Sequence, residues 1–244
     1  MISVCLACYN GEKYISEQVL SILKQLSPTD ELIISDNGST DDTVSILHEI
    51  ADDRMKIYTY LPLLNNHHRH SNLHYKVSKN FEFVLGLAKG DYIFLADQDD
   101  VWEFNKVKKT LMALESYDLV LSNYSIINSE GVSVQPVFHK SIPLKKIAWM
   151  NIVNMPFHGC CMAFRKVILQ DILPFPSELI THDNWIGILA YIKGYKVGYI
   201  DIPLVKYRRH QSNVSSFASK SCNPIWFRIW YRIVLASQII NRCF

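Results

Sequence analysis

Short apolar runs alternate with helical patterns along the first half of the chain. Runs rich in Val, Ile, Leu and Phe predict strands at residues 2–8, 31–35, 55–60 and 91–96. Apolar residues that recur every three or four positions predict helices at residues 12–25, 41–51, 80–88 and 105–115. This alternation is typical of an α/β fold in which helices cover a parallel sheet.

The second half of the chain is less regular. Apolar runs predict strands at residues 118–128, 160–164 and 195–200, then a strand-like stretch to Tyr207, and a helix is expected to begin near Asp183. The chain has 244 residues, of which 49% are hydrophobic, so it is long enough for one large domain with its own core.

Polar residues follow three of the predicted strands, at the point where each strand ends. They form the segments 9–11, 36–39 and 97–99. Because ligands bind beyond the carboxyl ends of the strands in open α/β sheets, these segments indicate one shared crevice. The sequence contains neither GxGxxG nor GxxxxGK[ST], which disfavours a Rossmann dinucleotide site and a P-loop.

The segment Asp97-Gln98-Asp99-Asp100 places three carboxylates directly after an apolar run. Unpaired carboxylates at the end of a buried strand repel one another and lose hydration, so they need a cation or a polar ligand. Carboxylate oxygens suit Mg²⁺ or Mn²⁺, which complete their coordination with water and substrate phosphates. An Asp-rich turn or a helix N-cap is the alternative.

The net charge of +2 hides an uneven distribution. Residues 202–244 contain seven Lys and Arg and no Asp or Glu, so they carry +7 and leave −5 for residues 1–201. A basic segment beside an acidic body indicates an anionic partner such as a phosphate group or a membrane surface, and the acidic body argues against nucleic acid.

The N-terminus has no basic leader, and polar residues at positions 9–12 come too early for a signal peptide, so we expect a cytoplasmic protein. The longest uncharged run, residues 147–164, contains Pro and several Asn, and we predict no transmembrane helix. In the cytoplasm the six cysteines are expected to be reduced. Cys5 and Cys8 should point to opposite faces of one strand, and Cys160 and Cys161 should be small core residues of another.

Three motifs together resemble the signature of family 2 glycosyltransferases of the GT-A fold. They are the segments 4–11 (VCLACYNG), 35–43 (SDNGSTDDT) and 97–102 (DQDDVW), and the resemblance extends over residues 2–215. It implies a Rossmann-like, mostly parallel sheet sandwiched by helices.

By position, the resemblance implies that Asp36 accepts a hydrogen bond from the imide N–H of a uracil or thymine. Ala7 and Tyr9 would line the same base pocket, and Asn72 and Lys79 lie where the family often contacts the nucleotide. The alternative for Asp36 is a turn residue that caps the next helix.

For the acidic segment, the resemblance implies that Asp97 contacts the ribose or the metal and that Asp99 binds the Mn²⁺ or Mg²⁺ ion that bridges the diphosphate. The segment 207–214 (YRRHQSNV) resembles a rhamnosyltransferase-like subset of bacterial members. There His210 is a candidate third metal ligand, on a loop whose arginines close over the diphosphate. An exposed basic loop is the alternative.

The segment 181–185 (THDNW) matches the place where the family carries its catalytic base. An inverting transfer needs one carboxylate to remove the proton of the acceptor hydroxyl as its oxygen attacks the anomeric carbon. Asp183 is the candidate, and His182, in place of the more frequent Glu, again resembles the rhamnosyltransferase-like subset. The alternative is that Asp183 only caps the helix that follows.

We predict a glycosyltransferase domain over residues 1–215, with a nucleotide-sugar-binding half (1–103) and an acceptor and catalytic-base half (104–215). Residues 216–244 would form a basic tail. From Pro224 onward the tail predicts an amphipathic helix with its arginines on one side and aromatic and aliphatic residues on the other. Such a helix suits a membrane surface, or else it packs on its own domain or on a partner.

The resemblance implies a metal-dependent, inverting hexosyltransferase. Its donor would be a nucleotide diphosphate sugar, with dTDP-L-rhamnose favoured over a UDP-hexose. Its acceptor would be a bacterial surface polysaccharide, O-antigen or capsule precursor on a lipid carrier, reached from the cytoplasm by peripheral association with the inner face of the plasma membrane. The alternatives are a non-catalytic nucleotide-sugar-binding assembly subunit and a sugar nucleotidyltransferase, although the Gly-rich opening loop of the latter is missing.

Overall fold

The computed structural model describes residues 1–61, 72–139, 143–177, 179, 181–211, 213 and 225–243. The strands are β1 (Ile2–Cys8), β2 (Glu31–Asp36), β3 (Met55–Thr59), β4 (Tyr92–Asp97), β5 (Val101–Trp102), β6 (Leu119–Ile127), β7 (Ser133–Gln135), β8 (Met162–Arg165) and β9 (Val197–Arg208). The α-helices are α1 (Ile15–Leu23), α2 (Thr43–Ile50), α3 (Asn72–Leu87), α4 (Lys106–Leu114), α5 (Met150–Asn154), α6 (Leu169–Ile172), α7 (His182–Ile192) and α8 (Ile225–Cys243). Two short 3₁₀ turns, Gly159–Cys161 and Lys166–Ile168, flank β8.

The described strands form one sheet in the order β3-β2-β1-β4-β8-β6-β9-β5, with β7 added beside β6. Strands β1 to β4 run parallel, as their alternation with helices predicted. Strand β8 is antiparallel to both β4 and β6, and β9 is parallel to β6 but antiparallel to β5. The sheet is therefore parallel over the first part of the chain and mixed beyond it.

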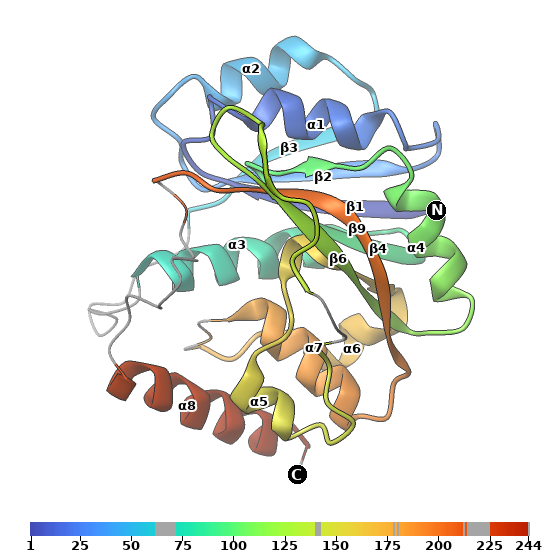
Figure 1. Ribbon diagram of the computed structural model, residues 1–244. Coiled ribbons are helices and arrows are strands. Elements are labelled where there is room, and N and C mark those ends of the chain that lie inside the picture. The colour runs from blue at the N-terminus through green and yellow to red at the C-terminus, as the bar shows by residue number, and fades with distance from the viewer. Residues whose placement is uncertain are drawn as a thin grey trace.

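Helices cover both faces of this sheet (Figure 1). On one face, α1, α2 and α4 bury apolar side chains such as Ile15, Leu47 and Val107. On the other, α3, α6 and α7 bury a second core that includes Phe81 and Trp185. Helices α5 and α8 contact each other and lie outside α7, at the lower edge of the molecule in this view. The sheet is thus the middle layer of an α/β sandwich.

The cysteines test the strand predictions. Cys5 belongs to the core beneath α3 and Cys8 to the core beneath α1, which confirms that they point to opposite faces. Cys160 and Cys161 are buried, as predicted, but the prediction that they lie in a strand is wrong. They form the 3₁₀ turn in which the N–H of Cys161 donates to the carbonyl of His158 (3.1 Å), and β8 begins only after it.

Two other elements are longer than their patterns indicated. Helix α3 begins at Asn72 rather than near residue 80, because Tyr75 and Val77 pack against the core although their neighbours are polar. Strand β9 joins the two strand-like stretches at 195–200 and up to Tyr207 into one strand. In both cases contacts with distant segments extend an element beyond its local pattern.

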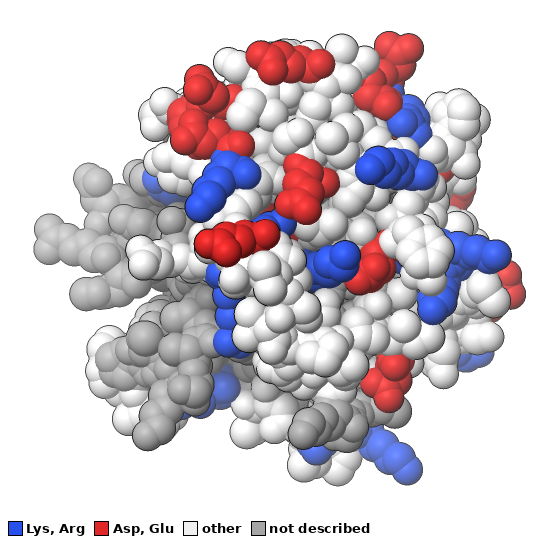
Figure 2. Space-filling model, turned by 45° about the horizontal axis from the view of Figure 1, so that its top comes forward, with Lys and Arg blue, Asp and Glu red and all other residues white. Residues whose placement is uncertain are grey.

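Charges are distributed unevenly over the surface. Figure 2 shows carboxylates gathered over the upper part of the molecule, where α1 and α2 lie, with Lys and Arg more frequent below them. Among the helices that the structure describes, none combines the length and apolarity needed to cross a membrane.

Candidate active site

The carboxyl ends of β1, β2 and β4 meet at one edge of the sheet. Cys8 pairs with Asp36, and Ala7 pairs with Ser35 on one side and Asp97 on the other. Parallel register therefore brings Ala7, Asp36 and Asp97 together, as expected for strand ends that share a crevice.

The turn after β2 holds the carboxylate of Asp36 with its own backbone. Oδ2 of Asp36 accepts the N–H groups of Gly38 and Ser39 (both 2.9 Å), and Oδ1 accepts the Ser39 hydroxyl (2.5 Å). The thiol of Cys8 lies 3.7 Å from Oδ1. Asp36 therefore caps its own turn in this structure. Its weakest contact is the one with the Cys8 thiol, so a stronger hydrogen-bond donor could bind Oδ1 beside or in place of that thiol.

The turns after β1 and β4 are joined by an amide that sequence reasoning passed over. The Tyr9 N–H donates to Oε1 of Gln98 (2.7 Å), and Nε2 of Gln98 donates to the Tyr9 carbonyl (3.0 Å). A Cβ on Gly11 would lie 2.8 Å from Oε1 of Gln98, so a side chain there would push the Gln98 amide aside. This pair of hydrogen bonds fixes Tyr9, whose ring is exposed, over the acidic turn.

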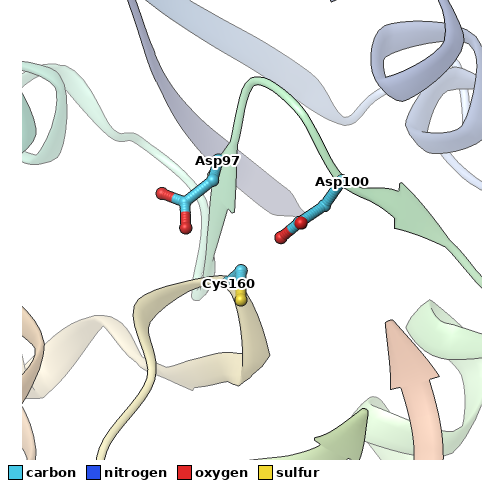
Figure 3. A group of neighbouring side chains, drawn as sticks. All are labelled: Asp97, Asp100 and Cys160. Atoms are coloured by element: carbon cyan, nitrogen blue, oxygen red, sulfur yellow. The ribbon is translucent and has the colours of Figure 1, made fainter. Parts of the chain in front are cut away.

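Asp97 and Asp100 form a tight group with Cys160, which comes from the 3₁₀ turn before β8 (Figure 3). The ligand atoms of the three side chains lie within 4.8 Å of one another. Oδ1 of Asp100 accepts the Arg208 N–H (3.0 Å), but its buried Oδ2 has no hydrogen-bond partner among the described residues. Sequence reasoning placed Asp100 in the turn and Cys160 in the core without bringing them together.

Burial and repulsion between neighbouring carboxylates disfavour the charged forms of Asp97 and Asp100. Burial, together with the charges of Asp99 and Asp183, raises the pKa of Asp97 to about 7. Burial and the neighbouring Asp99 and Asp97 raise the pKa of Asp100 as well. A site of this kind favours protonation or a bound cation.

Asp99 faces the segment that follows β9. Its Oδ2 lies 2.8 Å from Nε2 of His210 and accepts the side-chain amide of Asn213 (3.0 Å). The ring of His210 lies 4.8 Å from that of Tyr14, which helps to hold the imidazole in place. The structure therefore brings together two of the three predicted metal ligands, Asp99 and His210, although they come from distant segments.

Arg208 departs from the expected exposed or mobile loop. It lies at the end of β9 and is almost completely buried, with its guanidinium 4.7 Å from the ring centre of Tyr14. Its Nε donates to the carbonyl of Asp99 (2.9 Å), and Nη2 pairs with Glu17. Arg208 therefore supports the acidic turn through the Asp99 carbonyl. Its guanidinium N–H groups already bind groups of the protein.

Asp183 lies in the first turn of α7 and is partly exposed. Its Oδ1 accepts the backbone N–H of Asn184 (2.7 Å) and the side-chain amide of the same residue (3.1 Å). Burial raises the pKa of Asp183 to about 6, against the opposing effect of these hydrogen bonds. The Gly159 backbone also donates to Asp183, so the turn that carries Cys160 connects this carboxylate to the acidic turn.

His182 and Gly159 pack closely at the same place. A Cβ on Gly159 would lie 3.1 Å from Nε2 of His182, and the His182 ring stacks on Phe81 with ring centres 4.2 Å apart. Burial lowers the pKa of His182 to about 3, so the ring is neutral at physiological pH.

Two candidate nucleotide contacts lie in α3. Lys79 forms an ion pair with Glu82 (2.6 Å) and lies 5.9 Å from the ring centre of Tyr75. Asn72 opens the helix, but its side chain lies outside the described residues. The residue that ties α3 to β2 is Asn80, whose amide donates to the Ser35 carbonyl beside Asp36 (2.9 Å).

The donor set at the acidic turn fits a divalent cation. Asp99 and His210 offer a carboxylate oxygen and an imidazole nitrogen 2.8 Å apart, and Asp97 and Asp100 offer two further carboxylates in their group with Cys160. Carboxylates suit Mg²⁺ and Mn²⁺, and an added imidazole is compatible with Mn²⁺.

A family model described as Glycosyl transferase family 2 matches residues 3–173 of the chain. Among curated proteins, the dTDP-rhamnosyl transferase RfbG of Shigella flexneri is 28% identical over 219 residues, which cover 85% of this chain and 72% of RfbG. The UDP-Glc:alpha-D-GlcNAc-diphosphoundecaprenol beta-1,3-glucosyltransferase WfgD of Escherichia coli is 26% identical over 233 residues, covering 93% of this chain and 84% of WfgD.

Solved structures show the same fold. TarS 1-349 of S. aureus in complex with UDP-GlcNAc matches all of this chain with a TM-score of 0.70 at 22% identity, and the chain covers 67% of it. In the complex of TarS with UDP, the chain covers 60% of TarS. Glucosyl-3-phosphoglycerate synthase from Mycobacterium tuberculosis, in complex with Mn²⁺, UDP and phosphoglyceric acid, matches with a TM-score of 0.57 at 18% identity. These likenesses confirm the GT-A fold that the motifs predicted.

Proposed function

Because the chain belongs to glycosyl transferase family 2, we propose that it transfers a sugar from a nucleotide diphosphate donor to a hydroxyl group of a bacterial polysaccharide precursor. The observation that carries this proposal is the position of Asp183. Its partly exposed carboxylate stands next to the acidic turn, close enough for its charge to raise the pKa of Asp97. A base beside a diphosphate-binding turn is what transfer to a hydroxyl requires.

In this proposal Asp183 removes the proton of the acceptor hydroxyl as its oxygen attacks the anomeric carbon, and the configuration inverts. The pKa of about 6 leaves the carboxylate ionised at neutral pH and makes it a stronger base than an exposed aspartate. The two hydrogen bonds from Asn184 orient the carboxylate.

Asp99 and His210 would hold the divalent cation, with Asp97 or Asp100 contributing a further carboxylate. A bound cation would offset the charge of the departing diphosphate. Arg208 keeps the turn in position through the Asp99 carbonyl. Asp36, Ala7 and Tyr9 would surround the base, with the imide N–H donating to Asp36.

For the donor, we favour dTDP-L-rhamnose and rank UDP-hexoses next. The names of RfbG and WfgD support these two nucleotides, and the latter name also supports an acceptor linked to a lipid diphosphate. A thermal-shift comparison of dTDP, UDP and GDP with Mn²⁺ tests the role of Asp36, because guanine presents a different edge. Stronger stabilisation by GDP would contradict that role.

The variant Asp183→Asn tests the mechanism. Loss of the base should lower kcat on the order of 10² to 10⁴, while donor binding, measured by calorimetry, stays close to that of the wild type. The wild-type rate should also fall as the pH drops below about 6, because protonated Asp183 cannot accept a proton. The exposed Asp53, changed to Asn, is the matched control.

The same measurements separate the alternatives. A non-catalytic binding subunit would bind the donor without transferring its sugar, with any acceptor. A sugar nucleotidyltransferase would release pyrophosphate from a nucleoside triphosphate and a sugar 1-phosphate. Full turnover by Asp183→Asn would refute the assignment of the base.

A further inference from the structure

Helix α8 turns its apolar side away from the protein. Three apolar residues, Phe227, Leu235 and Ile239, are buried against the domain. The exposed apolar residues of the helix are Ile225, Trp226, Ile229, Trp230, Ile233 and Ile240. At 3.6 residues per turn these six positions span an arc of about 140°, so they form one continuous face of the helix.

Two of the three arginines of α8, Arg232 and Arg242, are turned toward the domain instead. Nε and Nη2 of Arg232 donate to the Val153 carbonyl (both 3.1 Å). Arg242 donates to the carbonyls of Asp171 (3.0 Å) and Leu173 (3.2 Å), and its guanidinium lies 5.3 Å from the ring centre of Trp185. An amphipathic helix on a water-soluble surface normally has the opposite orientation, with its charged side in water. Here the basic side anchors the helix and the aromatic side is left in solvent.

Helix α5 lies beside α8 and adds further exposed apolar side chains. The Val153 carbonyl that accepts Arg232 belongs to α5, and the two helices lie in contact. The Val153 side chain itself is exposed, as are three apolar residues before or at the start of α5, Ile147, Trp149 and Met150. We call the exposed apolar residues of the two helices, with residues 145–150, the α5–α8 surface.

The charges at this surface have one sign. Residues 143–155 and 225–243 contain no Asp or Glu. Lys145 and Lys146 are exposed next to Ile147, and Arg228 is partly exposed on α8. A second copy of the chain would bring a surface of the same charge, whereas an anionic lipid bilayer would complement it.

The positions of the tryptophans also indicate a lipid bilayer as the partner of this surface. Trp149, Trp226 and Trp230 are 41%, 63% and 43% exposed and belong to the α5–α8 surface, whereas Trp102 and Trp185 are buried. Tryptophan prefers the interface between lipid headgroups and acyl chains, and so do helices with one strongly apolar face. Of the five tryptophans in the chain, the two buried ones belong to the core and the three exposed ones belong to the α5–α8 surface.

We propose that the α5–α8 surface docks the protein on an anionic lipid bilayer, with the tryptophan and isoleucine side chains inserted at the interface and Lys145 and Lys146 at the headgroups. Binding of this surface to lipid requires neither the sugar donor nor the sugar acceptor, so the proposal does not depend on the transfer reaction. In this arrangement Arg232 and Arg242 hold the helix to the domain, and its apolar side is the one that meets the lipid.

Flotation of the full chain with vesicles tests this proposal. Vesicles of phosphatidylethanolamine and phosphatidylglycerol should carry the wild-type protein, and phosphatidylcholine vesicles should carry much less. The double variant Trp226→Ser/Trp230→Ser should bind the anionic vesicles at least tenfold more weakly, because it removes two interfacial anchors. Lys145→Glu/Lys146→Glu should also bind more weakly, since each basic residue near the surface contributes about 1 kcal/mol, or about fivefold.

A matched control exists on the opposite side of the sheet. Phe104 and Met112 are 84% and 60% exposed but lie just before and on α4, and Phe104→Gln/Met112→Gln should bind vesicles like the wild type. Circular dichroism and the thermal shift caused by UDP or dTDP verify that every variant is folded.

Tryptophan emission gives a second, independent measurement. Because the exposed tryptophans all lie on the α5–α8 surface, brominated phosphatidylglycerol should quench the wild-type emission strongly and that of Trp226→Ser/Trp230→Ser weakly. The proposal is overturned if the wild type ignores anionic vesicles, or if the control variant loses as much binding as the tryptophan variant. It is also overturned if light scattering shows that the surface joins two copies while vesicles are left unbound.

Discussion

The turns after β2 and β4 both carry several carboxylates, but the two turns differ in the hydrogen bonds that these carboxylates accept and in the direction of their pKa shifts. After β2, backbone and hydroxyl groups of the turn donate to Asp36. In the same turn Thr43 and Glu12 donate to Asp41 and lower its pKa, although burial works against this. After β4, burial and like charges raise the pKa of Asp97 to about 7, and one oxygen of Asp100 has no partner among the described residues.

The contrast separates two tasks that the sequence pattern alone does not distinguish. In the turn after β2, Asp36 and Asp41 already accept hydrogen bonds from the protein, so this turn can present a fixed surface to a neutral ring. In the turn after β4, one buried oxygen of Asp100 has no hydrogen-bond partner among the described residues, and His210 is the imidazole placed against Asp99. Acidic segments of similar composition can therefore serve as a rigid recognition element or as a cation site, depending on which donors surround them.

Among changes in these two turns, Asp99→Asn should have the largest effect. Loss of this carboxylate should lower Mn²⁺-dependent turnover on the order of 10² to 10³, the size of effect seen when one stabilising group is removed from a reacting centre. Mn²⁺ binding, followed by electron paramagnetic resonance, should weaken in parallel. Asp41→Asn in the other turn should leave Mn²⁺ binding unchanged. Equal weakening by both variants would break the comparison between the turns.

The next effect concerns stability. Asp36→Ala removes the acceptor of two backbone N–H groups and one hydroxyl, and unsatisfied buried donors of this kind cost about 1–3 kcal/mol. Asp100→Asn should cost less, because the amide oxygen can still accept the Arg208 N–H while a buried charge is removed. Urea unfolding without metal measures both variants. A larger loss for Asp100→Asn would show that the turn after β4 is the better satisfied one.

Local patterns were sufficient for the first part of the fold. Strands β1 to β4 and helices α1 and α2 lie close to the predicted ranges, because each is specified by its own periodicity. The rule that ligands bind at the carboxyl ends of parallel strands also placed Asp36 and Asp97 at one edge. The roles proposed for these residues in binding and catalysis stay predictions.

Contacts between distant segments could not be predicted from these patterns. Cys160 meets Asp97 and Asp100 only because β8 inserts antiparallel between β4 and β6. Arg208 becomes buried because Glu17 and the Asp99 carbonyl surround it. For α8, periodicity defined two sides of the helix but not which side faces the domain, since that depends on the carbonyl groups offered by α5 and the segment after α6.

A smaller effect should appear in the pH dependence of stability without metal. A carboxyl group whose pKa is raised on folding stabilises the protein at low pH, and this contribution is lost as the pH rises through the folded-state value. For Asp97 the loss should occur between about pH 4 and pH 7.

Unfolding experiments at pH 5 and pH 8 measure this dependence. Asp97→Asn should reduce the difference by about 1–2 kcal/mol, and Mn²⁺ should stabilise the wild type most at pH 8. The contribution of Asp41 to stability depends on pH in the opposite direction. Because its pKa is lowered on folding, Asp41 stabilises the protein at pH values above its unfolded-state pKa, and this stabilisation is lost in acid. If Asp97→Asn left the pH dependence unchanged, Asp97 would not have the raised pKa on which the contrast between the two turns depends.

The smallest effect tests how the acidic turn is joined to its neighbour. Gln98→Ala removes two hydrogen bonds to Tyr9, and Gly11→Ala brings a methyl group against the Gln98 amide. Each change should cost about 1 kcal/mol alone, but Gly11→Ala should cost much less when Gln98 is already Ala, because its obstacle is gone. A double-mutant cycle measures this coupling. Additive effects would mean that the turns after β1 and β4 are held independently. Gln98 would then serve only as a spacer between the carboxylates of the acidic segment.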